Sequence, residues 1–281
     1  MGATKLFILF SFLGIFTCNN SKSYEERVNL SNQYACEQFE IKNEQYGVNT
    51  KHTFKVQVIV IGTDTLRLED LEANLKDFGR QANFEFKIIK THFDSICTAY
   101  PISYQKMLED NYTPGLITIM IVCDHVRFEE EGDGRIDGAA LGIPELDDPT
   151  KGRPILFVRS SVAYGKILHH EGSHLLGLSH TFKDYDYDNR GLNCDVRIGD
   201  GVPDTVTPIR TGSVGAESCL YYAPEAALKD YSREEIMNMV RNPQSYSPPS
   251  CMGEFTEAQV QKMRKMIEVN SRLQDCLIKT K

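Results

Sequence analysis

The first half of the chain alternates hydrophobic and polar residues in a way that predicts strands and a helix. Apolar residues stand at every second position of segment 53–61, which is typical of a strand, and Gly62 ends it. Leucine and phenylalanine then recur at helical spacing over residues 68–78. Further apolar segments, which are also expected to be strands, are 84–90, 116–123 and 154–158. A strand, a helix and more strands before the next helix predict a mixed α/β sheet.

The pattern changes after residue 181. Residues 184–218 are rich in Asp, Gly and Pro and show little periodicity. Regular structure returns at Thr256, which forms a capping-box pair with Gln259 at the start of a closing helix. We therefore expect an α/β (α+β) fold in residues 51–281, with an upper subdomain up to residue 180 and an irregular lower subdomain that ends in a helix.

The N-terminus has the features of an export signal. Lys5 precedes an apolar stretch at residues 6–16, and a polar run follows Cys18. This stretch is too short to span a membrane, so residues 1–17 are predicted to be a signal peptide. A cysteine at that junction suggests a bacterial lipoprotein in which Cys18 carries the lipid, and the alternative is ordinary secretion with Cys18 removed. Residues 18–50 are interpreted as a tether or pro-segment.

Composition narrows the range of partners. The chain has 281 residues and a formal net charge of −8, which argues against nucleic acid because nucleic acid selects basic surfaces. No run of about 20 apolar residues is present, so no membrane-spanning helix is predicted and only the lipid could attach the chain to a membrane. Export would permit disulfides among the eight cysteines. If Cys18 is lipidated, an odd number remains and at least one thiol stays unpaired.

The most informative pattern is the motif HEGSHLLGLSH. His170 and His174 are four residues apart, so a helix places both imidazoles on one face, ready for a tetrahedral metal ion. Gly177 permits a sharp turn that brings back His180 as a third ligand. Three neutral ligands leave the fourth position to water, which is typical of a catalytic rather than a structural zinc. Glu171, beside the first ligand, can reach that water as a general base.

This motif resembles that of the metzincin zinc metallopeptidases, and further segments are similar to the pappalysin family. Thr181 and Phe182 follow the third histidine, GDGVPDT occupies residues 199–205, and Cys251 precedes the closing helix. Upstream, GAALGIP at residues 138–144 is similar to the rim and edge-strand segment of that family. The resemblance implies an active-site cleft between the upper and lower subdomains. A metallopeptidase of another metzincin branch would retain the same chemistry.

The resemblance implies a zinc-dependent endopeptidase that hydrolyses peptide bonds of extracellular proteins, with Glu171 as the base. Substrate is expected to lie extended along an edge strand near residues 154–158. The alternative, from another class of protein, is a surface-exposed binding lipoprotein that keeps the metalloprotease scaffold without turnover. Either protein would be exported, as a cell-surface or outer-membrane lipoprotein or in secreted form.

The resemblance also implies a Met-turn, a tight turn whose methionine packs beneath the zinc ligands. Met237, within the sequence EIMNM, is the candidate. Family members usually have Asn two residues before this methionine and Tyr two residues after it, whereas here Glu235 and Met239 stand there. Tyr246, in the loop before Cys251, could supply the missing tyrosine.

Two cross-links are expected to order the irregular segment after the third histidine. The resemblance implies a calcium ion, and its expected oxygen ligands are Asp200, Asp204 and Thr205. The second cross-link is a disulfide that joins Cys219 to Cys251 or to Cys194. We favour Cys219–Cys251, because it would tie this segment to the chain just after the Met-turn.

Overall fold

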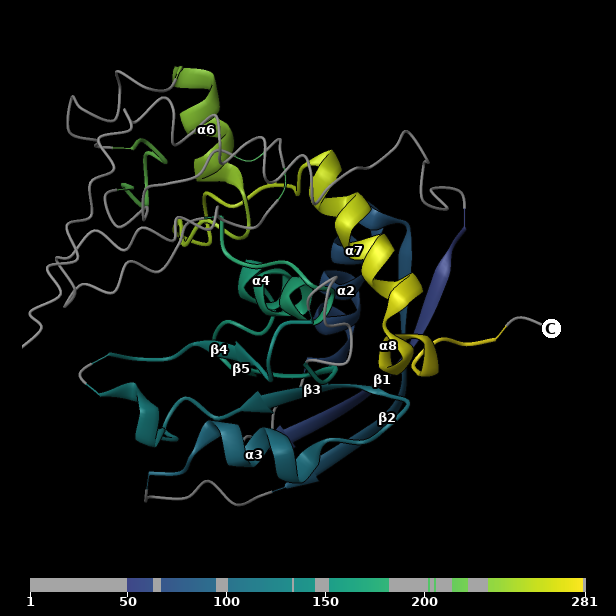
Figure 1. Ribbon diagram of the computed structural model, residues 1–281. Coiled ribbons are helices and arrows are strands. Elements are labelled where there is room, and N and C mark those ends of the chain that lie inside the picture. Colours follow the sequence, from purple (N-terminus) through teal and green to yellow (C-terminus); the bar gives the residue numbers. More distant parts are fainter. Residues whose placement is uncertain are drawn as a thin grey trace, which may run out of the picture.

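The computed structural model describes residues 50–62, 67–94, 101–132, 134–144, 152–181, 202, 205, 214–221 and 232–279. Its strands form one mixed sheet in the order β2-β1-β3-β5-β4 (Figure 1). Neighbouring strands are parallel in all pairs except β4 with β5, which are antiparallel. The strands are β1 (His52–Ile61), β2 (Phe84–Asp94), β3 (Ile117–Val122), β4 (Gly138–Ala140) and β5 (Ile155–Arg159). The predicted mixed α/β fold class is confirmed.

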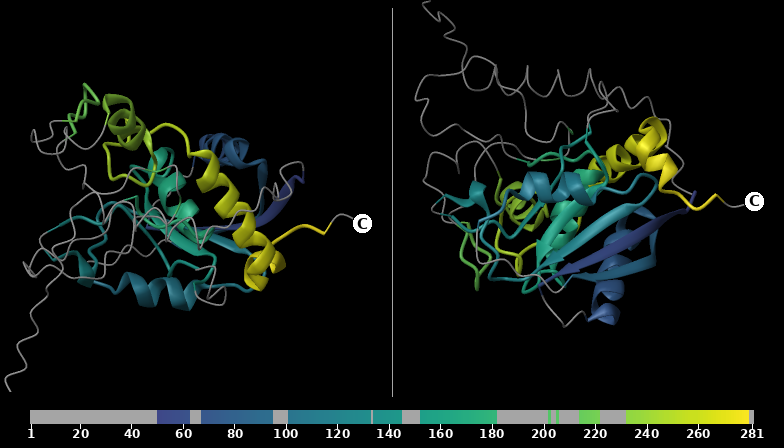
Figure 2. Two further views of the ribbon diagram at one scale, coloured as in Figure 1. Left: turned by 45° about the horizontal axis from the view of Figure 1, so that its top comes forward. Right: turned by 90° about the horizontal axis from the view of Figure 1, so that it is seen from below.

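Helices cover both faces of the sheet. One face packs against α2 (Leu68–Ala82), α4 (Lys166–Leu175), α7 (Glu257–Val269) and the short α8 (Ser271–Asp275), whereas α3 (Tyr104–Asn111) covers the other (Figures 1 and 2). The short 3-10 helix η1 (Glu129–Glu131) follows β3, and α6 (Arg233–Arg241) lies away from the sheet. None of the helices in the described part of the chain is long and apolar enough to cross a membrane.

The alternation of β1 explains how the two layers form. The side chains of Phe54, Val56, Val58 and Val60 lie in the core shared with α2, α4 and α7, whereas Ile59 lies in the core under α3. Both faces of β3 and β5 are buried, as their nearly continuous apolar sequences predict. The capping box at the start of α7 is present, since the Thr256 hydroxyl accepts from Gln259 N–H and the Gln259 side chain accepts from Thr256 N–H.

The edge of the sheet next to α4 is formed by β4, three small residues that are too few to show a periodic pattern. This strand falls within segment 138–144, which the family resemblance indicates as the rim and edge-strand segment. Segment 154–158, near which substrate was expected to lie, forms β5, an inner strand that pairs with β3 on one side and with β4 on the other.

Candidate active site

Helix α4 carries the first two histidines of the motif and is held against the core by its apolar side. Leu168 and Leu175 are buried in the same core as α2. Gly172 lets the two helices approach closely, because a Cβ atom at this position would stand 2.7 Å from Cε1 of Phe78. The sequence therefore leaves the opposite side of α4, with His170 and His174, facing away from this core.

The chain turns sharply at Gly177, as the motif predicts. Its φ angle is +86°, in the region that favours glycine, and a Cβ atom there would stand 2.8 Å from Cε of Met266. The turn is closed by the N–H of Leu178, which donates to the carbonyl of Ser173 at 3.0 Å. It brings His180 back beside the two histidines of α4.

The three imidazoles converge on one point. The Nε2 atoms of His170, His174 and His180 each lie 3.2 Å from the other two. Nitrogen ligands of a tetrahedral zinc, at a bond length of about 2.0–2.1 Å, are about 3.3 Å apart. Among the described residues this is the only group of three His, Cys, Asp or Glu side chains that could hold a metal ion. The donor set therefore fits zinc.

Backbone carbonyls fix the tautomers of the two helical histidines. Nδ1–H of His170 donates to the carbonyl of Pro243 at 2.7 Å, and Nδ1–H of His174 donates to the carbonyl of Leu178 at 2.6 Å. Burial lowers the pKa of both imidazoles, so they are neutral near pH 7. Both Nε2 lone pairs are therefore free to bind a cation, and the rings are oriented by their second hydrogen bonds.

Glu171 lies beside the histidines and against the edge strand. Its side chain is buried, and a Cβ atom on Gly138 of β4 would stand 2.7 Å from its Cγ and 3.1 Å from its Oε1. Burial raises the pKa of Glu171 to about 8 in the metal-free site. A divalent cation held nearby would lower that pKa and favour the carboxylate, which is the form a general base needs.

The turn that contacts the histidines is Asn242–Ser247, so the prediction of Met237 as a turn methionine is wrong. Met237 lies within α6, one turn before the helix ends. Gln244 occupies the place under α4 instead, fully buried, with its Nε2 donating to the carbonyl of His170 at 2.9 Å. The sequence pattern predicts no helix over residues 233–241, which form α6. Residues 242–247 show no periodic pattern from which their packing could be predicted.

Tyr246, in the same turn, packs its ring against two of the histidines. Its ring centroid is 4.5 Å from that of His180 and 5.4 Å from that of His170. The side chain is 43% exposed, and the residue has a φ angle of +57°, which is strained for a non-glycine residue. A tyrosine ring thus lies beside the histidine triangle, at the residue that the sequence offers for this role.

Comparison with protein families finds one matching model. Residues 157–268 match the Peptidase M43 family, described as pregnancy-associated plasma protein-A. The matched segment contains most of β5, all of α4, the three histidines, the turn beneath them and nearly all of α7.

Residues 157–268, with the three histidines that could hold a metal ion, thus resemble a metzincin-like zinc metallopeptidase.

Solved structures and curated sequences give more distant results. The chain is similar to archaemetzincin from Methanopyrus kandleri, with 10% identity and a TM-score of 0.40 over 77% of this chain and 96% of that chain. It is also similar to metalloproteinase-II from Bacteroides fragilis, with 16% identity and a TM-score of 0.28 over 57% of this chain and 61% of that chain. No curated protein sequence gives a significant match.

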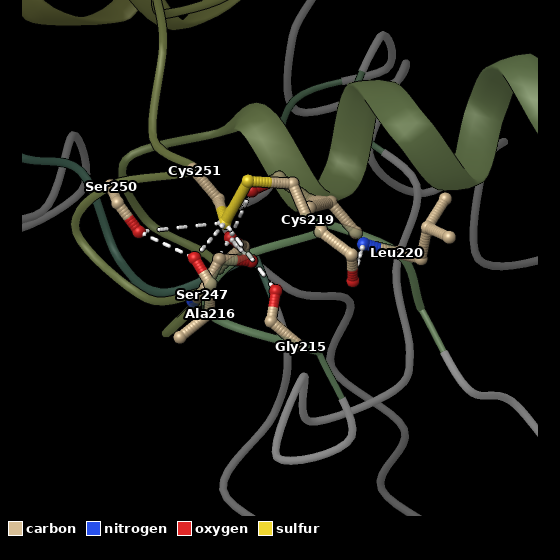
Figure 3. Close-up of a disulfide and its surroundings, with 10 residues drawn as sticks. Gly215, Ala216, Cys219, Leu220, Ser247, Ser250 and Cys251 are labelled. Carbon is tan, nitrogen blue, oxygen red and sulfur yellow. Dashed lines mark hydrogen bonds between the residues drawn. A yellow bond between two sulfur atoms is a disulfide. The ribbon is translucent and has the colours of Figure 1, made fainter.

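A disulfide joins two segments on the side of the turn Asn242–Ser247. Cys219 and Cys251 are bonded, as favoured in the sequence analysis, and this joins segment 214–221 to the chain just after the turn (Figure 3). Ser250 adds a hydrogen bond from its hydroxyl to the carbonyl of Ala216 at 2.9 Å. In the described part of the chain Cys276 is a free cysteine, and it is buried.

Several predicted features lie outside the described residues. These are the signal peptide, the lipidation site Cys18, and the two aspartates of the calcium site, Asp200 and Asp204. Thr205 is described, and its hydroxyl donates to the carbonyl of Val202 at 3.2 Å. Calcium binding and lipidation stay predictions.

Proposed function

We propose that the chain is an exported endopeptidase that hydrolyses peptide bonds of extracellular proteins, with Glu171 as its general base. The observation that supports this most strongly is the triangle of Nε2 atoms, 3.2 Å on each side, with Glu171 next to it in α4. A structural zinc site would have no use for a buried carboxylate that is placed beside the ligands but is not one of them.

The metal would contribute Lewis-acid chemistry. Zinc held by His170, His174 and His180 would supply a Lewis acid that polarises the scissile carbonyl and acidifies the attacking water. The Glu171 carboxylate would take a proton from that water and pass it to the leaving amine. The buried position of Glu171 keeps bulk water away from this proton and strengthens the interaction of its carboxylate with nearby charge.

Substrate would bind along β4. Among the described residues this strand pairs only with β5, so its other edge is available for the main chain of an extended peptide. Gly138 brings that edge against Glu171, which would put the scissile bond near the base. Tyr246, on the histidines, would donate its hydroxyl to the carbonyl oxygen of the bond being cut as negative charge develops there.

The alternative function, a binding lipoprotein without turnover, would follow if no tyrosine lay beside the metal site, as the residue two after Met237 suggests. The ring of Tyr246 against His170 and His180 counts against this alternative. Export itself is proposed from the N-terminal pattern, with a lipid on Cys18 as the attachment to the membrane. The pappalysin-like calcium ion is likewise a proposal, and calcium-dependent melting of the protein would test it.

Zymography of the mature chain on casein or gelatin tests the proposed function. We expect cleavage by the parent, loss of cleavage with a zinc chelator and recovery on adding zinc. Glu171→Gln should cleave about 10²–10⁴-fold more slowly while it retains zinc, because the glutamate is a base and not a ligand. Comparable cleavage by Glu171→Gln, or no cleavage by the zinc-loaded parent, would contradict the proposal.

A further inference from the structure

Gln244 is a buried polar residue whose side chain contacts the helix that carries two of the histidines. It is 0% exposed, and its Nε2 donates to the carbonyl of His170 at 2.9 Å and to Oγ of Ser173. The Ser173 hydroxyl in turn donates to the same His170 carbonyl at 2.9 Å. The turn Asn242–Ser247 is therefore bonded to the backbone of α4 through this one amide.

The contacts of the turn hold His170 at two points. The carbonyl of Pro243 accepts from Nδ1–H of the imidazole at 2.7 Å, and the side chain of Gln244 donates to the main-chain carbonyl of the same histidine. Because the acceptor and the donor belong to consecutive residues of the turn, the ring and the backbone of His170 are held by the same short segment. The location of the His170 Nε2 atom then depends on how the Gln244 side chain holds this segment against α4.

Gln244 also contacts the segment of the third histidine. Its main-chain carbonyl accepts from the N–H of Thr181 at 3.1 Å and from the Thr181 hydroxyl at 3.3 Å. Thr181 directly follows His180 in the sequence. Gln244 thus links the backbone at His170, in α4, to the backbone next to His180, beyond the turn at Gly177.

Stability alone does not account for an amide at this position. Within the described part of the chain, Oε1 of Gln244 is buried and has no hydrogen-bond partner. The cost of that unpaired oxygen and the gain from the hydrogen bonds of Nε2 are of the same order. A methionine has a similar length and would fill the space without an unpaired polar atom. What the amide adds is direction, through hydrogen bonds to defined atoms of α4.

We propose that Gln244 is a positioning residue that sets the separation of His170 and His180 for metal binding, through directed hydrogen bonds where the family resemblance predicts an apolar methionine contact. The inference rests on the proposed binding of zinc by the three histidines. Residues that orient the ligands of a metal contribute about 10–100-fold to its affinity.

The test compares Gln244→Met with the parent, using zinc titrated against a chromophoric chelator. We expect about tenfold weaker zinc binding. The visible spectrum of the cobalt-substituted protein should also change, because it reports the arrangement of the ligands. The unfolding midpoint of the zinc-free protein should stay close to that of the parent, since methionine fills the same space.

Gln57→Met is the matched control. Gln57 is also buried, in β1, its Nε2 donates to Oγ1 of Thr113 at 3.4 Å, and its Oε1 has no partner among the described residues. The same substitution there should leave zinc affinity and the cobalt spectrum as in the parent. Equal losses of affinity in both variants would overturn the proposal, because they would report general loosening.

Parental zinc affinity and an unchanged cobalt spectrum in Gln244→Met would also overturn it. If that variant does not fold, Ser173→Ala tests the same set of bonds by removing one acceptor of the Gln244 amide. It should bind zinc more weakly than the parent, and unchanged binding would reject the proposal. A parent without zinc affinity would overturn both this proposal and the proposed function, whereas weak binding by the variants alone supports both.

Discussion

Helix α4 lies between two regions that hold it by different means. On the side of α2 and the sheet the middle of the helix packs by apolar contacts, with Gly172 against the ring of Phe78, and hydrogen bonds to α2 come from Lys166 and His169 near its start. On the side of the turn Asn242–Ser247 the contacts are hydrogen bonds, in which Gln244 donates to the backbone of His170 and the carbonyl of Pro243 accepts from its ring. Apolar packing is not directional, so it can place a helix but cannot aim an imidazole. The turn supplies the direction.

The largest expected effect comes from damage to the apolar side. Phe78→Ala removes a buried ring that contacts Phe86, His169 and Phe255, with centroid distances of 5.4, 5.3 and 5.9 Å. The free energy of unfolding should fall by about 3–5 kcal/mol, measured by urea denaturation. The control Phe93→Ala removes a ring that is 55% exposed and should change stability by less than about 0.5 kcal/mol. Similar losses in both variants would contradict this account of the core.

Removal of the disulfide should destabilise the region of the turn Asn242–Ser247. Cys219 and Cys251 close a loop with a sequence separation of 32, so replacing both by serine should cost about 2–4 kcal/mol. Hydrogen exchange should accelerate in α6 and the turn more than in β1 and β3, because the bond lies on the side of the turn. Uniform acceleration across the sheet would show that the two regions do not behave differently.

The contact between β4 and Glu171 gives a sharper test at the junction of the two regions. Gly138→Ala adds a Cβ atom 2.7 Å from Cγ of Glu171, so the carboxylate must move. Displacement of a catalytic group by about 1 Å can cost about 10²-fold in rate, and we expect that loss in kcat with zinc retained. Gly134→Ala is the control, since its Cβ atom would meet only the carbonyl of Glu131 at 3.7 Å. Full activity in Gly138→Ala would argue against Glu171 as the base.

The smallest effect is expected at the exposed edge of the turn. Tyr246→Phe keeps the ring on His180 and removes only the hydroxyl. A hydrogen bond to the negative charge that develops in the transition state contributes about 1.5 kcal/mol at an exposed position, so kcat should fall about tenfold while KM stays near that of the parent. A change in KM alone would mean that the hydroxyl binds substrate without assisting the reaction.

The two regions also differ in how far the sequence predicts them. The strands and α2 follow from alternating and helical patterns, because burial on one side repeats with the period of the element. The zinc ligands follow from a motif in which four-residue spacing and Gly177 determine the geometry. The turn 242–247 could not be predicted in this way, since Gln244 and Pro243 act through hydrogen bonds that leave no period. The family resemblance therefore suggested a methionine in the nearest matching letters, and Met237 proved to belong to a helix.

The proposed activity depends on zinc bound by three histidines, one of which comes from beyond the turn at Gly177. The most direct measurement is the metal content of the purified chain, determined for the parent, for His180→Ala and for His125→Ala, an exposed histidine remote in sequence from the motif. We predict about one zinc per chain in the parent and in His125→Ala, and a large loss of zinc in His180→Ala because one of three ligands is gone. Full zinc in His180→Ala would contradict the account.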